Sequence, residues 1–262
     1  MEALSGVENL VFWPSWDDEP WADLAREELA LGRAASSGPV LCAYAWNRPV
    51  LVLGYGQRPS EQDRARWRRE GLPVLRRCSG GTGVLHEGRA SALSLSLALP
   101  SHHPFAGSIG ASYDALVNPV EEALGALGIG ARRWSPGDRN PLPRRSPICF
   151  EDHRTESLLV DGRKVFGGAQ ARRRESVLVH GALLFSLDAA FQGRVYGVSP
   201  ERILAAMGAV SLETPAGPRD VAEATAAALA RRFGVEVSRE TPPPPSGDLA
   251  ARATDPRWVV VP

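Results

Sequence analysis

The chain has 262 residues, of which 44% are hydrophobic and 23% charged, so its apolar side chains are sufficient for an ordinary globular core. The formal net charge is zero, which provides no general attraction to nucleic acid or to an anionic membrane surface. No apolar run approaches the roughly 20 residues of a membrane span, and no basic segment precedes an apolar block at the N-terminus, so we expect a cytoplasmic protein.

The first predicted elements are a helix and two strands. Residues 17–31 combine an acidic start, Pro20 and an apolar stripe, and Gly32 is expected to end the helix. Residues 40–46 and 50–56 are β-rich runs separated by Asn-Arg-Pro. Two such runs joined by a short polar segment predict a hairpin.

Further along, helical and extended patterns alternate. Residues 60–71 predict a surface helix whose first serine is its N-cap. Residues 74–86 predict a strand broken by a glycine-rich turn, and the apolar run 92–99 follows. Apolar residues at helical spacing over 112–127 predict another helix, in which Pro119 should introduce a kink or delay the start.

The middle of the chain predicts a long loop and then three strands. Residues 131–147 are rich in proline, glycine and arginine, which is typical of a loop. Residues 157–170 predict a hairpin that turns at Asp161 and the glycine after it, and residues 177–185 add a strand.

The remaining pattern defines the fold class. Residues 199–208 and 220–234 predict two helices. Helices flanking a mostly antiparallel sheet indicate an α+β fold. We expect one catalytic domain over residues 1–240 and a proline-rich linker and C-terminal tail over residues 241–262.

Lysine is nearly absent from the chain. Lysine and arginine total 30 residues, and Lys164 is the only lysine among them. A lysine differs from an arginine in having a compact, rotatable ammonium group, so a single lysine indicates a position where a guanidinium does not serve. Two glycines at positions 167 and 168 leave space near it. The alternative is that codon bias removed the other lysines and this one survived by chance.

The segment RRCSGGTGVLH, residues 76–86, has a glycine-rich turn after a strand. Glycines let the backbone approach a ligand closely, and the adjacent Arg76 and Arg77 are suited to carboxylate or phosphate oxygens. The pattern is neither a Walker A loop nor a GxGxxG turn. A purely structural glycine-rich hairpin remains the alternative.

Cys149 follows the long loop, where Arg144 and Arg145 would favour its thiolate. A free cysteine is also commonly a small buried hydrophobic residue, and that interpretation suits Cys42, which lies within a strand pattern. Cys149 is therefore a candidate nucleophile on local grounds only.

The cysteines and histidines do not have the spacing of a metal site. Cys42, Cys78 and Cys149 lie far apart, and only His102 and His103 are adjacent, beside a proline. Structural zinc needs four ligands at suitable spacing. We expect no metal site.

Three segments, in order, resemble motifs of the lipoate–protein ligase and octanoyltransferase family. Residues 46–57 resemble its W…P…vslG.nQ strand, residues 76–86 its RRxSGGGAVxH signature, and residues 163–185 its KxxGSAQ…R…LxHGxLL stretch. The chain departs from these motifs at Thr82 and Gly168, among other positions. The resemblance implies the fold shared with biotin protein ligases, in which a mixed sheet with helices on one side holds a tunnel for the acyl chain.

The resemblance also implies roles for individual residues. Lys164 would contact the carboxyl or thioester carbonyl of the substrate. The residues expected to line the acyl pocket are Arg76, Arg77, Ser79, Gly80, Gly81, His86, Gly167, Ala169, Gln170 and His180.

Two branches of the family use different chemistry, and the sequence favours one of them. Cys149-Phe150 precedes Lys164 at the spacing of the branch that moves octanoate from acyl carrier protein onto a cysteine. The GRNDL pattern of the ATP-dependent ligases is absent, and we expect no accessory domain after the catalytic domain. The attack of a thiolate on a thioester divides a transfer into two easier steps.

The resemblance implies the following partners and alternatives. The acyl acceptor would be a lysine of a lipoyl-domain protein, such as glycine-cleavage H protein or a dehydrogenase E2, and no cofactor would be needed. Basic residues at 63–77 and 172–174 would suit an acidic carrier, although a solvated arginine face is an equal alternative. An ATP- and Mg-dependent lipoate–protein ligase acting through lipoyl-adenylate, and a non-catalytic acyl- or lipoyl-domain-binding relative, remain alternatives.

Overall fold

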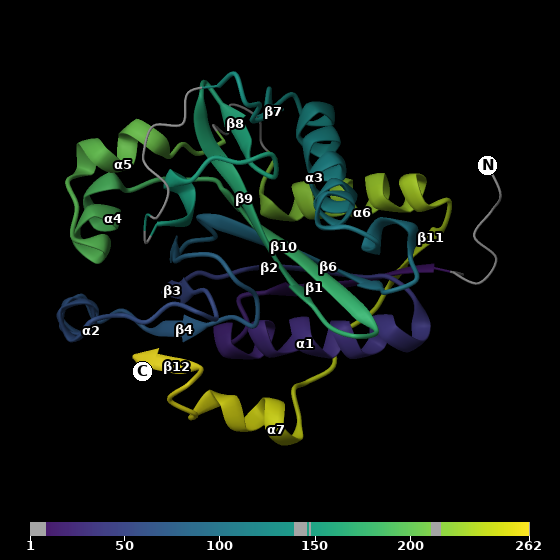
Figure 1. The fold of residues 1–262 in the computed structure, drawn as a ribbon, viewed down its shortest axis with the longest axis horizontal. Coiled ribbons are helices and arrows are strands. Elements are labelled where there is room, and N and C mark those ends of the chain that lie inside the picture. Colours follow the sequence, from purple (N-terminus) through teal and green to yellow (C-terminus); the bar gives the residue numbers. More distant parts are fainter. Residues whose placement is uncertain (1–8, 139–145, 147, 211–215, 262) are drawn as a thin grey trace.

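Two sheets organise the chain in the computed structural model, which describes residues 9–138, 146, 148–210 and 216–261 (Figure 1). Within these residues, the larger sheet has eight strands in the order β11 (Glu236–Arg239), β1 (Asn9–Trp16), β2 (Val40–Ala45), β6 (Ala92–Pro100), β10 (Ser176–Leu184), β9 (Arg163–Arg172), β8 (Leu158–Val160) and β7 (Arg132–Arg133). The smaller sheet has the order β12 (Val259–Val261), β4 (Val74–Arg76), β3 (Pro49–Leu53) and β5 (Val84–Glu87). β1 pairs in parallel with β2 and β11, and β3 with β4, whereas the other pairs are antiparallel, so both sheets are mixed.

Strand β6 buries both of its faces. Its leucines, at every second position over residues 93–99, join the main core, and each contributes about 1.5–3 kcal/mol by leaving water. Successive side chains of a strand point to opposite faces, so the intervening serines face the other way. Ser96 there donates a hydrogen bond to Glu27. A strand buried on both faces requires a cover on each side.

Helices cover both faces of the larger sheet. α3 (Ile109–Ala126) and α6 (Pro218–Phe233) pack together on one face, and α1 (Pro20–Ser37) lies across the other (Figure 1). The expected arrangement with helices on one side is therefore wrong, because the buried serine face of β6 needs α1 to exclude water.

The hairpin predicted over residues 40–46 and 50–56 is also wrong. β2 pairs with β1 and β6, whereas β3 belongs to the smaller sheet. The carbonyls of Trp46 and Asn47, at the point where the chain changes sheet, accept hydrogen bonds from the backbone N–H groups of Ala90 and Arg89. This turn brings the start of β6 beside the end of β2.

Two local predictions are confirmed. α2 (Glu61–Arg69) begins with a capping box between Ser60 and Asp63. β8 and β9 form the predicted hairpin, and Asp161 and Gly162 at its turn have φ values of 50° and 75°. These left-handed conformations are what a two-residue type I′ turn requires.

The predicted helices are present, with differences at their ends. α1 continues past Gly32, which is exposed, and a helix tolerates such a glycine at a cost of about 1 kcal/mol. Pro119 lies inside α3 and does not delay its start. α5 (Pro200–Ala206) begins at the expected cap, and α4 (Ala189–Tyr196) was not predicted. Short 3₁₀ turns occupy Pro104–Ala106 (η1), Cys149–Glu151 (η2) and Ala251–Ala253 (η3).

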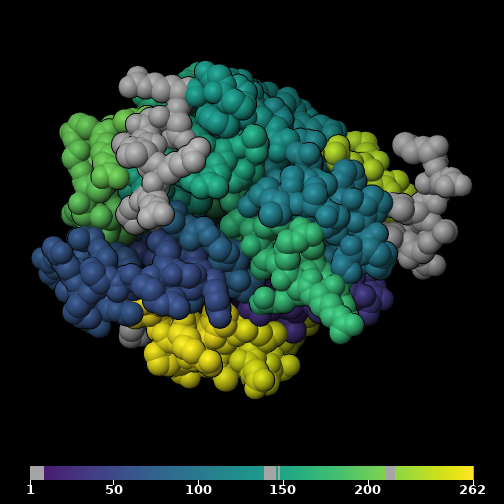
Figure 2. All heavy atoms as spheres, in the orientation of Figure 1, coloured from purple at the N-terminus to yellow at the C-terminus, as the bar shows by residue number. Residues whose placement is uncertain are grey.

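The C-terminal segment, by which we mean residues 247–261, packs against α1. It contains α7 (Gly247–Ala250), and β12 pairs with β4. Arg252 donates two hydrogen bonds to Glu28 of α1 and stacks on Trp258, with 3.8 Å between guanidinium carbon and ring centre. Figure 2 shows the segment (yellow) as a continuous surface beside the blue residues of α2 and the smaller sheet. The division at residue 240 stays a prediction.

Among the residues that the structure describes, none of the helices is both long enough and apolar enough to span a bilayer.

Candidate active site

Lys164 lies on β9 with its ammonium group inside the protein. Its side chain is almost fully buried, and Nζ donates hydrogen bonds to the carbonyl oxygens of Cys149 (3.0 Å) and Asp152 (2.6 Å). Nζ also lies 5.5 Å from the ring centre of Phe150, a favourable cation–π distance. An ammonium has three donors, so two fix its position and one remains for a ligand.

Gly167 is required by the position of Lys164. A Cβ at residue 167 would lie 2.5 Å from Cε and 2.9 Å from Nζ of the lysine, closer than real contacts allow. The same point is 3.7 Å from Sγ of Cys149. The thiol and the ammonium therefore flank the small space that this glycine leaves open.

Cys149 is held at the start of η2 by contacts from two directions. Its backbone N–H donates to the carbonyl of Gly83, which ties it to the glycine-rich turn, at 3.0 Å. Glu151, fully buried, accepts hydrogen bonds from Nε (2.7 Å) and Nη2 (2.9 Å) of Arg202 on α5. A bidentate arginine–carboxylate pair is geometrically specific, so it fixes the backbone that carries the thiol.

Two hollows meet at Cys149. The first, which we call the enclosed cavity to distinguish it from the second, spans about 380 Å³ of space that is partly open to solvent, and its walls are mostly apolar. The second, which we call the open cleft, has a volume of about 1170 Å³ and a more polar lining. Cys149, Gly168 and Ala169 line both. A group bound to the thiol can therefore lie in the enclosed cavity while a partner approaches through the cleft.

The structure brings most of the predicted site residues to these two hollows. Those lining the enclosed cavity are Arg77, His86, Cys149, Gly167, Ala169 and His180. Those lining the open cleft are Gly80, Gly81, Cys149, Lys164, Ala169 and Gln170.

The glycine-rich turn is shaped by Arg77 from within. Its buried guanidinium donates to the carbonyls of Gly80 (2.7 Å) and Thr82 (3.0 Å) and to Oγ of Ser79 (3.0 Å). Gly81 has φ of 83°, and the turn passes so close to β3 that a Cβ at Gly54 would lie 2.0 Å from the Gly81 carbonyl oxygen. Arg77 therefore supports the turn and lines the cavity with part of its side chain.

The position of Arg76 differs from the prediction that it lines the acyl pocket. It does not line the enclosed cavity, because consecutive side chains of β4 point to opposite faces. Its guanidinium donates to the carbonyls of Gly54 (2.9 Å), Gln57 (2.8 Å) and Arg257 (2.9 Å). Arg76 thus braces loops of the smaller sheet.

A buried polar network that the sequence analysis missed lies behind the enclosed cavity. His180 contacts Ser79 through Nε2 (2.6 Å) and Glu27 through Nδ1 (3.0 Å), and Tyr44 donates to Glu27 at 2.8 Å. Burial raises the pKa of Glu27, but His180 and the hydrogen bonds outweigh that effect and lower it overall. Glu27 therefore stays ionised in the interior. The sequence did contain one signal for this network: Glu27 is a charged residue only three positions after Leu24, which lies on the apolar face of the predicted helix.

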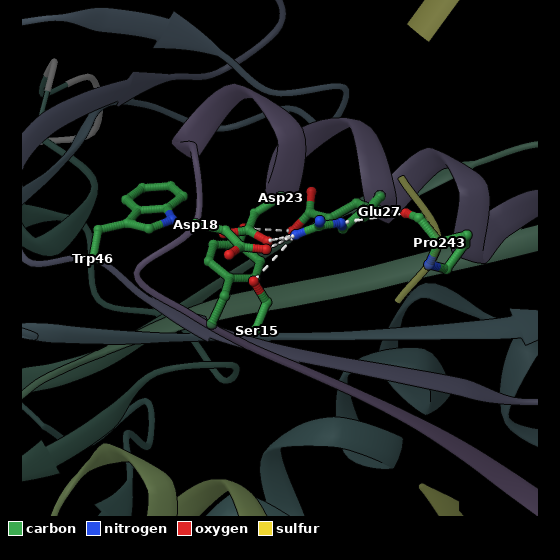
Figure 3. A network of polar contacts seen from close by, with 8 residues as sticks. Ser15, Asp18, Asp23, Glu27, Trp46 and Pro243 are labelled. Atoms are coloured by element: carbon green, nitrogen blue, oxygen red, sulfur yellow. Dashed lines mark hydrogen bonds and ion pairs between the residues drawn. The ribbon is translucent and has the colours of Figure 1, made fainter. Parts of the chain in front are cut away.

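Helix α1 is fixed on the sheet by a second polar network around Ser15, Asp18 and Asp23 (Figure 3), whose common partner is Arg26. Its guanidinium contacts Ser15 Oγ (3.1 Å) and the carboxylates of Asp18 (2.6 Å) and Asp23 (2.8 Å). Asp23 also accepts a hydrogen bond from the Trp46 indole at 2.8 Å. These contacts fix the first turns of α1, which border the enclosed cavity.

The entrance of the cleft is shaped by Tyr113 on α3. Its ring lies over Gly168, where a Cβ would be 3.2 Å from a ring carbon. Burial and the charge of Glu156 raise the pKa of the Tyr113 phenol to about 12, so the hydroxyl keeps its proton at neutral pH. Gln170, also in the cleft wall, donates to the carbonyl of Ile109 at 3.2 Å.

Two further predictions are that Arg144 and Arg145 favour the Cys149 thiolate and that the chain holds no metal site. Arg144 and Arg145 lie outside the described residues. Within residues 9–138, 146, 148–210 and 216–261, no group of three or more histidine, cysteine, aspartate or glutamate side chains is arranged to hold a metal ion.

His86 is expected to make the fold sensitive to acid. Burial, and then the charge of Arg77, lower its pKa from 6.5 to about 3, so the folded protein holds it neutral. Below pH 6.5 the unfolded chain binds a proton that the folded chain does not, so the free energy of unfolding falls by up to about 1.4 kcal/mol per pH unit. Urea unfolding between pH 7.5 and 4.5 would measure this fall. A His86→Gln variant should lose less stability over the same range, and equal slopes would contradict the assignment.

Comparisons with known proteins identify the family of the chain. The model of the lipoyl protein ligase A/B catalytic domain matches residues 19–230. Three curated proteins called Octanoyltransferase LipM are similar in sequence. The one from Macrococcus caseolyticus is 30% identical over 69% of this chain and 67% of its own length. Those from Staphylococcus aureus and Carboxydothermus hydrogenoformans are 33% and 36% identical, over 65% and 63% of this chain and 63% and 61% of theirs.

Solved structures share the fold at lower identity. A lipoate-protein ligase A bound with ATP superposes with a TM-score of 0.70 at 19% identity, over 93% of this chain and 91% of that chain. A bipartite lipoate protein ligase from Thermoplasma acidophilum, described with its E2 lipoyl domain, gives 0.67 at 19% identity, over 94% and 89%. These likenesses concern the fold, which is the mixed α+β fold described above.

Proposed function

The chain belongs to the lipoyl protein ligase A/B catalytic domain family, and from this premise we propose that it transfers an octanoyl group through Cys149 to a lysine of a lipoyl-domain protein. The observation that carries the proposal is the position of Cys149 between the enclosed cavity and the open cleft. The name of the curated relatives, octanoyltransferase, supports the same activity.

The first half of the reaction loads the enzyme. The Cys149 thiolate attacks the carbonyl carbon of an octanoyl thioester, a carbon–sulfur bond to Cys149 forms, and the bond to the carrier thiol breaks. The carrier leaves as a thiolate, which takes up a proton. One thioester replaces another, so the step needs no ATP. The eight-carbon chain would lie in the enclosed cavity, whose walls include Val52, Val84 and Ala182.

The second half delivers the acyl group. A neutral lysine amine enters through the cleft and attacks the acyl-enzyme carbonyl, the carbon–sulfur bond to Cys149 breaks, and an amide forms. The amine loses a proton, which restores the thiol. Lys164 would support both halves, because Nζ is held by the carbonyls of Cys149 and Asp152 and has a third N–H donor for a developing oxyanion.

The proposed partners are an octanoyl carrier, most simply acyl carrier protein, and a lipoyl-domain protein such as glycine-cleavage H protein or a dehydrogenase E2. The exposed arginines at 172–174 would attract an acidic partner. The basic residues at 63–77 suit this role less, since Arg66 pairs with Asp63 and Arg76 and Arg77 hold backbone carbonyls.

The experiment that tests the proposal needs no cofactor. The purified chain is incubated with octanoyl carrier protein without ATP or Mg²⁺, and its intact mass is measured. We expect one octanoyl group per chain, located on the peptide containing Cys149, and subsequent transfer to an added lipoyl domain. Modification that occurs only with free lipoate, ATP and Mg²⁺ would indicate the ligase reaction instead. Binding of a lipoyl domain without any modification would indicate a non-catalytic relative.

A further inference from the structure

A second apolar cavity lies beyond the enclosed cavity, beneath the C-terminal segment. It spans about 280 Å³ of space that is partly open to solvent, and its walls include Trp21, Ala25, Leu75 and Val259. Leu24 lines both cavities, and within the described residues it is the only side chain common to the two linings. A single leucine thus stands between them.

We propose that Leu24 sets the length of acyl chain that this enzyme accepts, and that the cavity behind it is a latent subsite for the distal carbons of chains longer than octanoyl. The inference rests on the proposed function, since it assumes an acyl chain anchored at Cys149. That anchor lies where the enclosed cavity meets the cleft, so the chain extends away from the cleft, and Leu24 is the wall on the side of the second cavity.

The second cavity suits an apolar occupant because the charged side chains at its edge already have partners. Arg252 is paired with Glu28 and stacked on Trp258, and Arg76 donates to backbone carbonyls. The remaining walls are mainly aromatic and aliphatic, with the buried thiol of Cys78, whose pKa burial raises far above its usual value. Hydrocarbon would therefore gain from entering this space.

Leu24 cannot move aside easily, because its neighbours on α1 are anchored. Asp23 accepts a hydrogen bond from the Trp46 indole, and Arg26 contacts Ser15 and Asp23. Glu27, one turn further on, is held by His180 and by Tyr44. The partition is therefore rigid in the native protein, and the second cavity becomes available only when the leucine side chain is shortened.

The test compares acyl-enzyme formation from thioesters of eight, ten, twelve and fourteen carbons, with initial rates read by intact mass. The wild type should load octanoyl fastest and fall steeply at longer chains. Leu24→Ala should raise the ratio of twelve-carbon to eight-carbon loading by about 10-fold or more, the selectivity that one or two methylenes command in a fitted pocket. For Leu24→Val we expect a ratio between those of the wild type and Leu24→Ala. This variant replaces Leu24→Ala in the test if the alanine variant does not fold.

Two matched variants separate the partition from simple enlargement. Val52→Ala widens the enclosed cavity without touching the second one, and it should raise the ratio far less than Leu24→Ala does. Ala25→Leu, added to Leu24→Ala, refills the second cavity and should remove the gain. An unchanged ratio in both Leu24 variants, or an equal increase in Val52→Ala, would overturn the proposal.

A binding measurement distinguishes failure of this proposal from failure of the proposed function. Calorimetric titration with free octanoate and dodecanoate requires no reaction at Cys149. Tighter dodecanoate binding by Leu24→Ala than by the wild type would support the partition even if neither protein were acylated. Equal dodecanoate binding by proteins that both load octanoyl would refute the partition alone.

Discussion

Cys149→Ser is expected to lower octanoyl transfer by about 10³-fold or more, because removal of a covalent nucleophile removes the acyl-enzyme route. A hydroxyl is a far weaker nucleophile than a thiolate at neutral pH, although its size suits the same position. The rate of transfer from octanoyl carrier protein to a lipoyl domain, together with intact mass, would measure the loss.

The matched control is Cys42→Ala. Cys42 is buried in β2 among the residues that pack α1 on the sheet, and it lines neither the enclosed cavity nor the cleft. Its replacement should retain the acyl-enzyme and most of the transfer rate. Full activity of Cys149→Ser would refute the covalent route and leave direct transfer or the ligase reaction.

Lys164→Arg is expected to reduce the same rate by about 10²–10³-fold, the usual cost of losing one donor to a developing oxyanion. Charge is preserved in this variant, so the loss tests geometry. A guanidinium is planar and larger than an ammonium, and the lysine already lies against the backbone at Gly167. The larger guanidinium would therefore lose the hydrogen bonds to the carbonyls of Cys149 and Asp152 and would displace the thiol.

Two further variants make this prediction specific. Arg163→Lys places a lysine on the exposed neighbouring position of β9 and should have little effect. Gly167→Ala keeps the lysine but fills the space beside it, and it should be nearly as damaging as Lys164→Arg. Thermal unfolding would confirm that each variant is folded. If Lys164→Arg kept full activity, the lysine would be a structural residue only.

Local sequence signals predicted the parts of the site that depend on short segments. The lone lysine, the hairpin turn at Asp161 and Gly162 and the glycine-rich turn each have a backbone or charge requirement within a few residues. The fold class followed from the alternation of helical and extended patterns.

The parts that could not be predicted depend on residues far apart in the sequence. β2 and β3 look like a hairpin locally, but more favourable neighbours for each strand come from β6 and β4. Glu27 is linked to the enclosed cavity by its contact with His180, which lies 153 positions away in the sequence. Arg76 and Arg77 are adjacent in the sequence, and only the backbone geometry at the end of β4 gives their side chains different partners.

The pairing of β4 with β12 determines when, during synthesis, the smaller sheet can be completed. β4 leads into the turn that carries Arg77 and Gly81, and its outer neighbour comes from residues 259–261. One edge of β1 is likewise covered by β11, which follows it by more than 200 residues in the chain. During synthesis these strands emerge with one edge uncovered, a condition that favours aggregation. The edge of β4 that faces β12 is therefore covered only once residues 259–261 have been synthesised and have paired with it.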